Sequence, residues 1–266
     1  MNASTGDNLD AMGREIARVV KRFPWVRMIV FGELCAHGPD PARAQSLPGP
    51  AEKHFCGLAR KHRVWLVPGS FYEIKGSRVF NTAPVIDPDG EVVARHRKIY
   101  PWKPYEKGID GGLEHTVFDV EGVGRFGLSI CYDMWFPETT RALVCQGAEV
   151  IIHPTMTNTI DRDVELAIAR ANAVTNQCYF IDVNNTGRFG LGRSVFVGPE
   201  GEIIHESGSG EEVVPVVVDL ERVRRTREKG VLGLGQPLKS FRDEKIGFPQ
   251  YGKHPGAYLR RLGVLD

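Results

Sequence analysis

Apolar residues along the chain recur at two spacings, one typical of helices and the other typical of strands. In segment 7–23, Leu9, Met12, Ile16 and Val19 lie three or four positions apart, which predicts an amphipathic helix. Further helices are predicted over 51–62, 139–148, 162–176 and 221–229. Short apolar runs predict strands over 26–33, 64–73, 78–87, 91–98, 115–120, 125–133, 149–155, 178–184, 194–199, 202–207 and 212–220. Helices and strands that alternate in this way indicate an α/β fold.

We expect a single domain over residues 1–266, because no linker-like stretch and no internal repeat interrupts this alternation. Its core covers about residues 5–229. In residues 230–266, Gly and Pro are frequent and the apolar positions follow no clean period. This composition predicts an extended C-terminal arm, long enough to lie over a neighbouring subunit.

The charge balance and the cysteines exclude several classes of protein. The 34 basic and 33 acidic residues give a net charge of +1, so we expect no nucleic-acid partner. No apolar run approaches the roughly 20 residues that cross a bilayer, and the N-terminus does not resemble a signal peptide, so we expect no membrane partner. The five cysteines are far apart and form no CxxC pair, which favours a reducing cytoplasm. Cys145 and Cys178 lie in apolar runs, so we expect both in the core.

Three residues whose side chains could take part in catalysis directly follow apolar strands: Glu33, Lys98 and Cys131. Ligands of α/β folds bind beyond the carboxyl ends of strands, so the three side chains converge if their strands are parallel neighbours. A carboxylate can then take the proton of a thiol, and an ammonium group can hold a negatively charged oxygen. From spacing alone, a buried core thiol, a solvated glutamate and a surface lysine are favoured over a catalytic group.

Longer blocks around these residues carry a family resemblance. IVFGEL (29–34), RHRKIYPWKPYE (95–106) and GLSICYDMWFPE (127–138) follow one another in order, and GAEVIIHPT, ARANAVTNQCYFIDVN and GRSVFVGPEGEII come after them. Together they resemble the nitrilase, or carbon–nitrogen hydrolase, superfamily from near residue 5 to about residue 220. The resemblance implies a four-layer αββα sandwich, a homodimer or larger homo-oligomer, and a covalent mechanism without metal or cofactor.

The resemblance also implies a role for individual residues. Cys131 would attack the carbonyl carbon of an amide and form a thioester. Glu33 would be the general base, and Lys98 with the backbone N–H of Tyr132 would hold the oxyanion. Glu106, within a PWxPxE pattern, would be a second glutamate that lines the pocket, although its position alone also fits a loop-surface charge.

The substrate is less sharply indicated, and Trp102 and Trp135 are expected to line its site. The segment CYDMxFPE resembles ω-amidases, which have an arginine at the Trp135 position to grip a carboxylate. The segment RKIYPWKPYE resembles aliphatic amidases and formamidases instead. Because Trp135 is uncharged, a small neutral carboxylic amide is favoured, with ω-amidase and N-carbamoyl amino acid amidohydrolase as alternatives. Trp135 is also a candidate for a subunit contact.

The start of the chain departs from the family pattern, which normally has a strand before the segment 6–12. Loss of a central strand exposes pairing edges and weakens the site near Glu33. A catalytically impaired member that binds a ligand or partner is therefore a second alternative.

Other polar residues are assigned structural positions or none. His37, His96 and His153 show no ligand spacing with Cys35, so no metal site is expected. Asp133 is expected to accept backbone hydrogen bonds at the turn after Cys131. Glu138, which follows Pro137, is expected in the first turn of the next helix.

Overall fold

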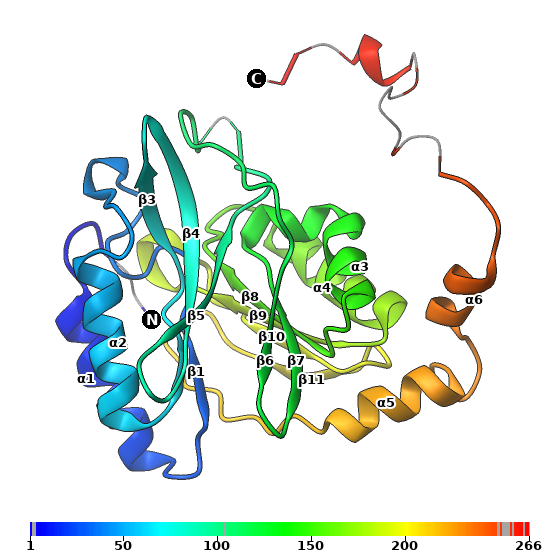
Figure 1. The fold of residues 1–266 in the computed structure, drawn as a ribbon, viewed down its shortest axis with the longest axis horizontal. Coiled ribbons are helices and arrows are strands. Elements are labelled where there is room, and N and C mark those ends of the chain that lie inside the picture. The colour runs from blue at the N-terminus through cyan, green and yellow to red at the C-terminus, as the bar shows by residue number, and fades with distance from the viewer. Residues whose placement is uncertain are drawn as a thin grey trace.

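Two β-sheets lie face to face, and helices cover their outer faces (Figure 1). This architecture comes from a computed structural model that describes residues 1, 4–103, 105–248, 251, 256, 258–262, 264 and 265. The first sheet has the order β1-β2-β4-β3, and β5 pairs with the other edge of β4. Its strands are β1 (Met28–Val30), β2 (Trp65–Val67), β3 (Phe71–Lys75), β4 (Arg78–Ile86) and β5 (Val92–Arg97).

The second sheet has six strands in the order β11-β10-β9-β8-β7-β6. The central strands β7, β8 and β9 are parallel, as expected for strands that alternate with helices. Hairpin partners extend both edges with antiparallel pairs. The strands are β6 (Thr116–Val120), β7 (Gly124–Leu128), β8 (Val150–Thr155), β9 (Tyr179–Asn184), β10 (Val195–Val197) and β11 (Ile203–Glu206).

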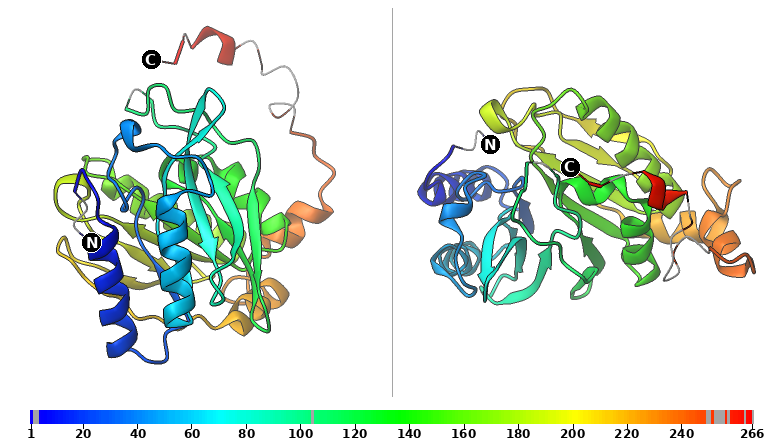
Figure 2. Two further views of the ribbon diagram at one scale, coloured as in Figure 1. Left: turned by 60° about the vertical axis from the view of Figure 1, so that its left-hand side comes forward. Right: turned by 90° about the horizontal axis from the view of Figure 1, so that it is seen from above.

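Two pairs of helices form the outer layers. α1 (Leu9–Arg22) buries Met12, Ile16 and Val19, as its periodicity predicted, and packs with α2 (Pro50–His62) on the first sheet. α3 (Pro137–Cys145) and α4 (Arg162–Asn176) cover the second sheet. Figure 2 shows the two pairs on opposite sides of the molecule. α5 (Leu220–Lys229) follows, and α6 (Pro237–Asp243) lies beyond it.

The main core lies between the two sheets. Val67, Ala83 and Val85 from the first sheet pack against Phe126 and Leu128 of the second, and all five are buried. Because each sheet has one face on this core and the other under helices, the layers stack as α, β, β, α. This confirms the αββα sandwich that the sequence predicted.

The predicted strand over 64–73 is divided in the structure. Gly69 separates β2 from β3 and has a φ of +76°, a conformation that favours glycine. A Cβ atom at this position would lie 1.8 Å from the carbonyl oxygen of Gly32. The backbone of this break therefore packs directly against the segment that leads to Glu33.

The predicted strand over 212–220 was wrong. Residues 212–219 have no strand assignment, and α5 begins at Leu220. The segment still alternates in burial: Val216 and Val218 pack against the inter-sheet core, and Val217 is exposed. The alternation that suggested a strand is therefore real, but no ladder involving this segment is formed among the described residues, and Pro215 has no N–H to donate.

Two further expectations were wrong, one in the C-terminal tail and one at the end of α3. Residues 237–243 form α6, where the irregular composition predicted only an extended arm. Cys145, at the end of α3, is exposed rather than part of the core, whereas Cys178 is fully buried as predicted. The parts of the arm at residues 249–250, 252–255, 257, 263 and 266 lie outside the described residues.

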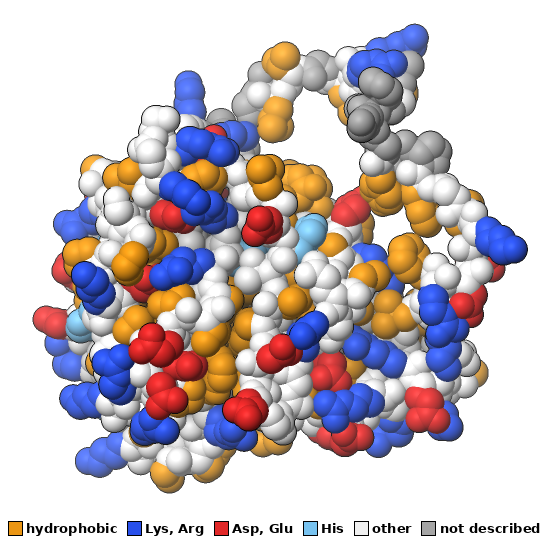
Figure 3. Space-filling view, viewed as in Figure 1, with side chains coloured by type: hydrophobic (Ala, Val, Ile, Leu, Met, Phe, Trp, Pro, Cys, Tyr) orange, Lys and Arg blue, Asp and Glu red, His pale blue; other side chains and the backbone are white. Residues whose placement is uncertain are grey.

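The surface carries both signs of charge. Figure 3 shows Lys and Arg side chains interspersed with Asp and Glu side chains over one face of the molecule, in line with the net charge of +1. Over the described ranges, no helix has both the length and the apolar composition needed to cross a membrane.

Candidate active site

The three strand ends meet, but not as parallel neighbours. β1 and β5 belong to the first sheet and are separated by β2 and β4, while β7 belongs to the second sheet. That part of the prediction was wrong. Glu33, Lys98 and Cys131 come together because the two sheets face each other across the core, and each residue lies just past the end of its strand.

Lys98 is held between two carboxyl groups. Its Nζ lies 2.9 Å from Oε1 of Glu33 and 2.7 Å from Oε2 of Glu106. All three side chains are buried, with Lys98 only 2% and Glu106 8% exposed. Glu106 therefore lies in the interior beside Lys98, and the interpretation as a loop-surface charge is wrong.

Asn81, a residue that the sequence analysis did not single out, joins the two glutamates. Its Nδ2 donates to Oε1 of Glu33 at 2.8 Å and to Oε1 of Glu106 at 3.0 Å. Asn81 lies in the middle of β4 and is completely buried. A buried amide within an apolar strand needs a polar partner, and this was the signal available in the sequence.

Cys131 lies on a strained turn between β7 and α3. Its φ is +47°, which is rare for a residue with a side chain, and it begins a 3₁₀ helix over Cys131–Trp135. Since the first N–H groups of a helix have no acceptor within it, the N–H of Tyr132 is left for another partner. The turn places the thiol in the core between the two sheets, close enough to the Glu33 carboxyl to help lower the pKa of that group.

Burial controls the proton affinities of this group. It raises the pKa of the Glu33 carboxyl, although Lys98 opposes the shift. It also raises the pKa of the Cys131 thiol well above the usual value, and Glu33 adds to this effect. Burial opposes the charged form of Lys98, but the charges on Cys131, Glu33 and Glu106 outweigh it and raise the pKa of Lys98. The resting state that follows is a neutral thiol beside a protonated lysine.

Asp133 fastens the two sheets together next to the site. Its Oδ1 accepts hydrogen bonds from the backbone N–H groups of Ile99 and Tyr100, at 3.0 and 2.9 Å. Its Oδ2 accepts from Ile130 N at 3.0 Å and lies 3.1 Å from Nε2 of His96. The expected bonds at the turn after Cys131 are confirmed. The carboxylate also ties this turn to the loop that follows Lys98, which was not foreseen.

The expected helix-end position of Glu138 is likewise confirmed, because this residue lies in the first turn of α3. The three histidines considered above lie in different surroundings. His96 contacts Asp133, His153 contacts Ser129, and His37 lies near Gln45. A search of the described residues finds no cluster of His, Cys, Asp and Glu that would hold a metal.

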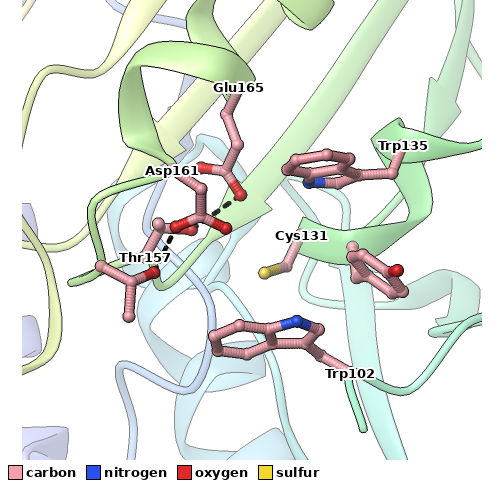
Figure 4. A pocket seen from close by; sticks show the side chains of 8 residues that line it. Trp102, Cys131, Trp135, Thr157, Asp161 and Glu165 are labelled. Carbon is pink, nitrogen blue, oxygen red and sulfur yellow. Dashed lines mark hydrogen bonds between the residues drawn. The ribbon is translucent and has the colours of Figure 1, made fainter.

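A narrow cavity opens beside Cys131, with a volume of about 10 Å³. Trp102, Tyr132 and Trp135 line it, so the structure brings the three predicted substrate-site residues together at one cavity (Figure 4). The ring of Trp102 stacks on Tyr105, with centroids 4.4 Å apart. The backbone N–H of Trp102 donates to Glu106 at 2.6 Å, which links the aromatic wall to the group around Lys98.

The opposite wall of the cavity consists of polar residues that the sequence analysis missed. Thr157, Asp161 and Glu165 lie there, across from the two tryptophans (Figure 4). Glu165 is 2% exposed, and its carboxyl accepts from Thr157 Oγ1 and pairs with Arg162 Nη1, both at 3.0 Å. Burial and the nearby Asp182 raise the pKa of Glu165 to about 7. In the sequence, no signal distinguishes Glu165 from the other polar residues of its helix, because the buried face of α4 also carries Arg162, Asn172 and Asn176.

Comparison with known proteins agrees with this geometry. The model of the carbon-nitrogen hydrolase family matches residues 2–228. The chain is 28% identical to the ω-amidase NIT3 of Saccharomyces cerevisiae, over 83% of this chain and 84% of the relative. It is also 28% identical to a formamidase of Bacillus cereus, over 80% of this chain and 69% of the relative.

A solved structure shows the same architecture. An amidase from Nesterenkonia sp. AN1, in which acrylamide has added to the active-site cysteine, superposes with a TM-score of 0.75 at 27% identity. The superposition covers 85% of this chain and 94% of that one. With the family model matching most of the sequence, the chain belongs to the carbon-nitrogen hydrolase family.

Proposed function

We propose that the protein hydrolyses a small carboxylic amide to an acid and ammonia, through a thioester on Cys131. The observation that carries this proposal is the buried Glu33 carboxyl, which is bound to the ammonium group of Lys98 and lies close enough to the buried Cys131 thiol for each group to shift the pKa of the other. The relatives support it, because they are named as an ω-amidase, a formamidase and an amidase.

In the first half of the reaction, Glu33 takes the thiol proton while Sγ of Cys131 attacks the carbonyl carbon. The electron pair of the C=O bond moves to oxygen, and the Lys98 ammonium group and the N–H of Tyr132 hold the resulting oxyanion. The C–N bond then breaks. The nitrogen takes the proton from Glu33 and leaves as ammonia, and the acyl group remains on sulfur.

In the second half, a water molecule gives a proton to Glu33 and attacks the thioester carbon. Collapse of the second oxyanion breaks the C–S bond and releases the acid, and the proton returns to sulfur. A general base works best when its pKa lies near the operating pH, so the raised pKa of Glu33 suits both steps. Glu106 and Asn81 hold Glu33 and Lys98 in place. Glu106 also offers a carboxyl oxygen that can accept from the amide nitrogen of the substrate.

The substrate is proposed to lack a carboxylate group. Trp135 stands at the cavity where an arginine would grip one, and it provides an apolar ring and a single N–H donor. A short neutral amide fits this wall and the small cavity. An ω-amidase remains the alternative, because one relative carries that name, and N-carbamoyl amino acids present a similar carbon to the same nucleophile.

Ammonia release from formamide, short aliphatic amides, ω-amides and carbamoyl amino acids tests the proposal directly. Cys131→Ala is expected to abolish turnover of every substrate without loss of fold, since the residue supplies the nucleophile. Cys145→Ala is the matched control, because Cys145 is exposed on α3, and this variant is expected to retain full activity. Turnover by Cys131→Ala would overturn the role of the thiol. No ammonia from any amide with the unaltered protein would favour the impaired, ligand-binding alternative.

Assembly and location belong to the same proposal. Leu232, Leu234 and Phe241 are exposed apolar residues at the start of the C-terminal tail, which supports an arm that packs on a second copy. Sedimentation at the mass of one chain would contradict this. A cytoplasmic location is proposed because the nucleophilic thiol must stay reduced, and cell fractionation tests it.

A further inference from the structure

The cavity beside Cys131 has two sides that differ in chemistry. Glu33, Lys98 and Glu106 contact one another on one side of the nucleophile and do not line the open part of the cavity. Under the proposed function, the amide group that reacts must lie toward them. The rest of the substrate then extends into the open part, where Asp161 and Glu165 form the far wall (Figure 4).

The charges of this far wall are unbalanced. Two of the eight described residues that line the cavity are carboxylates, and none of the eight is a lysine or an arginine. Arg162 is paired with this wall, but it is 1% exposed and its guanidinium group is bound to both Glu165 and Asp182, 3.0 and 2.7 Å away. One arginine is thus shared by two carboxyl groups, as Lys98 is shared by Glu33 and Glu106, and Asp161 adds a further negative charge at the cavity.

Aromatic rings complete the environment. Figure 4 shows Trp102 and Trp135 on either side of Cys131, with both indole groups bordering the space in front of Glu165 and Asp161. The faces of indole rings attract cations, most strongly where water is excluded. Carboxylates and indole rings around one small space are the combination that binds an ammonium group, and the same combination repels a carboxylate.

We propose that this cavity selects amides whose acyl chain ends in an ammonium group, with Asp161 and Glu165 as the residues that set the preference. The inference rests on the proposed amidase function and names its substrate class. The small volume of the cavity places the ammonium group only a few atoms from the carbonyl carbon. Uncharged amides of the same length remain substrates, less favoured, and amides that end in a carboxylate are the least favoured.

Three amides of equal chain length test the charge preference: 3-aminopropanamide, butanamide and succinamate. We expect kcat/KM to fall in that order, with about tenfold or more between the cationic and the neutral amide. Added salt should narrow the gap, since it screens the attraction. Equal rates, or a preference for succinamate, would overturn the inference and leave the amidase function standing. No hydrolysis of any amide would overturn the amidase function itself.

Two variants test whether Asp161 and Glu165 cause the preference for a cationic amide. Asp161→Asn removes one negative charge, and Glu165→Gln removes the charge that Glu165 carries when it is ionised, both with little change of shape. Because the pKa of Glu165 is raised to about 7, the rates are compared at pH 8, where its carboxyl is mostly ionised. Each variant should then lower the ratio of kcat/KM for 3-aminopropanamide to that for butanamide. Comparison of this ratio between each variant and the unaltered protein cancels the difference in intrinsic reactivity between the two amides. Glu165→Gln leaves Arg162 with one ionised partner fewer, so its fold is checked by circular dichroism. If it does not fold, Asp161→Asn decides, because Asp161 is partly exposed and its side chain accepts a hydrogen bond from the neighbouring Thr159 rather than from a buried partner.

Asp163→Asn is the matched control. Asp163 lies in the same first turn of α4, but its side chain is 79% exposed, pairs with Arg193 and does not line the cavity. Removal of this charge should leave the ratio unchanged. An equal drop in the ratio for Asp163→Asn, or no drop for either wall variant, would overturn the assignment to Asp161 and Glu165.

Discussion

At the scale of single residues, Asp133 shows how much can depend on one carboxylate that touches no reacting atom. Burial disfavours its charge, yet His96 and the backbone N–H groups of Ile130 and Tyr100 hold its pKa below the usual range. It is therefore a fixed anion. One oxygen fixes the loop after Lys98 and the other fixes the turn before Cys131.

Asp133→Asn is expected to lower kcat by about tenfold or more, because an amide cannot accept all of these hydrogen bonds and the turn at Cys131 loosens. The free energy of unfolding should fall by roughly 2–4 kcal/mol. The rate at which iodoacetamide alkylates Cys131 should change as well, and this readout separates positioning from stability alone.

Asp119→Asn serves as the comparison. Asp119 lies on β6 and forms an exposed ion pair with Arg125 of β7, so its loss should change stability far less than the loss of Asp133. An Asp133 variant with unchanged kcat and unchanged alkylation rate would show that this carboxylate only stabilises the fold.

At the scale of elements, the close approach of two backbones at Gly69 places the segment that carries Glu33. Gly69→Ala is expected to destabilise the protein by roughly 2–4 kcal/mol, because the new Cβ meets the Gly32 carbonyl as well as an unfavourable φ. Gly76 also has a positive φ, +63°, but its Cβ position is open. Gly76→Ala should therefore cost only about 1 kcal/mol. Urea unfolding of both variants checks the difference, and equal losses would show that the contact with Gly32 does not matter.

Helices and strands were largely predictable where buried residues recur at the spacing of one type of secondary structure. α1, α2, α4 and α5 lie within one or two residues of their predicted ranges. The segment 212–220 failed for a physical reason: alternating burial reports which side chains face the core, whereas a strand also needs a partner for its backbone. The division at Gly69 required knowledge of a contact between residues far apart in sequence.

At the scale of the whole molecule, buried titratable groups link stability to pH. Burial lowers the pKa of His153 to about 4. Since its value in the unfolded chain is about 6.5, the unfolded state binds the proton first, and stability is lost as pH falls from about 6.5 to 4. Glu165 acts in the opposite direction, because its raised pKa of about 7 makes stability fall as pH rises from about 4.5 to 7.

Comparison of the unaltered protein with a His153→Asn variant measures how much His153 contributes to the pH dependence of stability. His153→Asn is expected to be less stable than the unaltered protein at pH 7.5, since it loses the packing on Phe180. That deficit should shrink by up to about 2 kcal/mol at pH 5, where only the histidine must bind a proton to unfold. Urea unfolding of both proteins at pH 7.5 and pH 5 measures this change in the stability difference. A deficit that is the same at both would mean that His153 does not carry this pH dependence.

The site was predictable only in part: its residues could be found along the sequence, but their arrangement in space could not. Glu33, Lys98 and Cys131 were visible as strand ends within recognisable blocks, and their meeting point is real. Their strands, however, lie in two sheets, which spacing along one chain cannot reveal. Asn81 and Glu165 were missed because a polar residue within a strand or a helix usually faces water, and only the fold shows what it faces.

Because the site is divided between two sheets, its activity depends on how the two sheets are packed against each other. The gap between base and nucleophile is set by the thickness of the apolar layer that includes Val85 and Leu128, neither of which is polar. A small sideways slip of one sheet would separate sulfur from carboxylate while every helix and strand stayed intact. The rate of ammonia release should therefore respond to changes in core packing before the circular dichroism of the secondary structure does. On heating, we expect activity to be lost at a lower temperature than secondary structure.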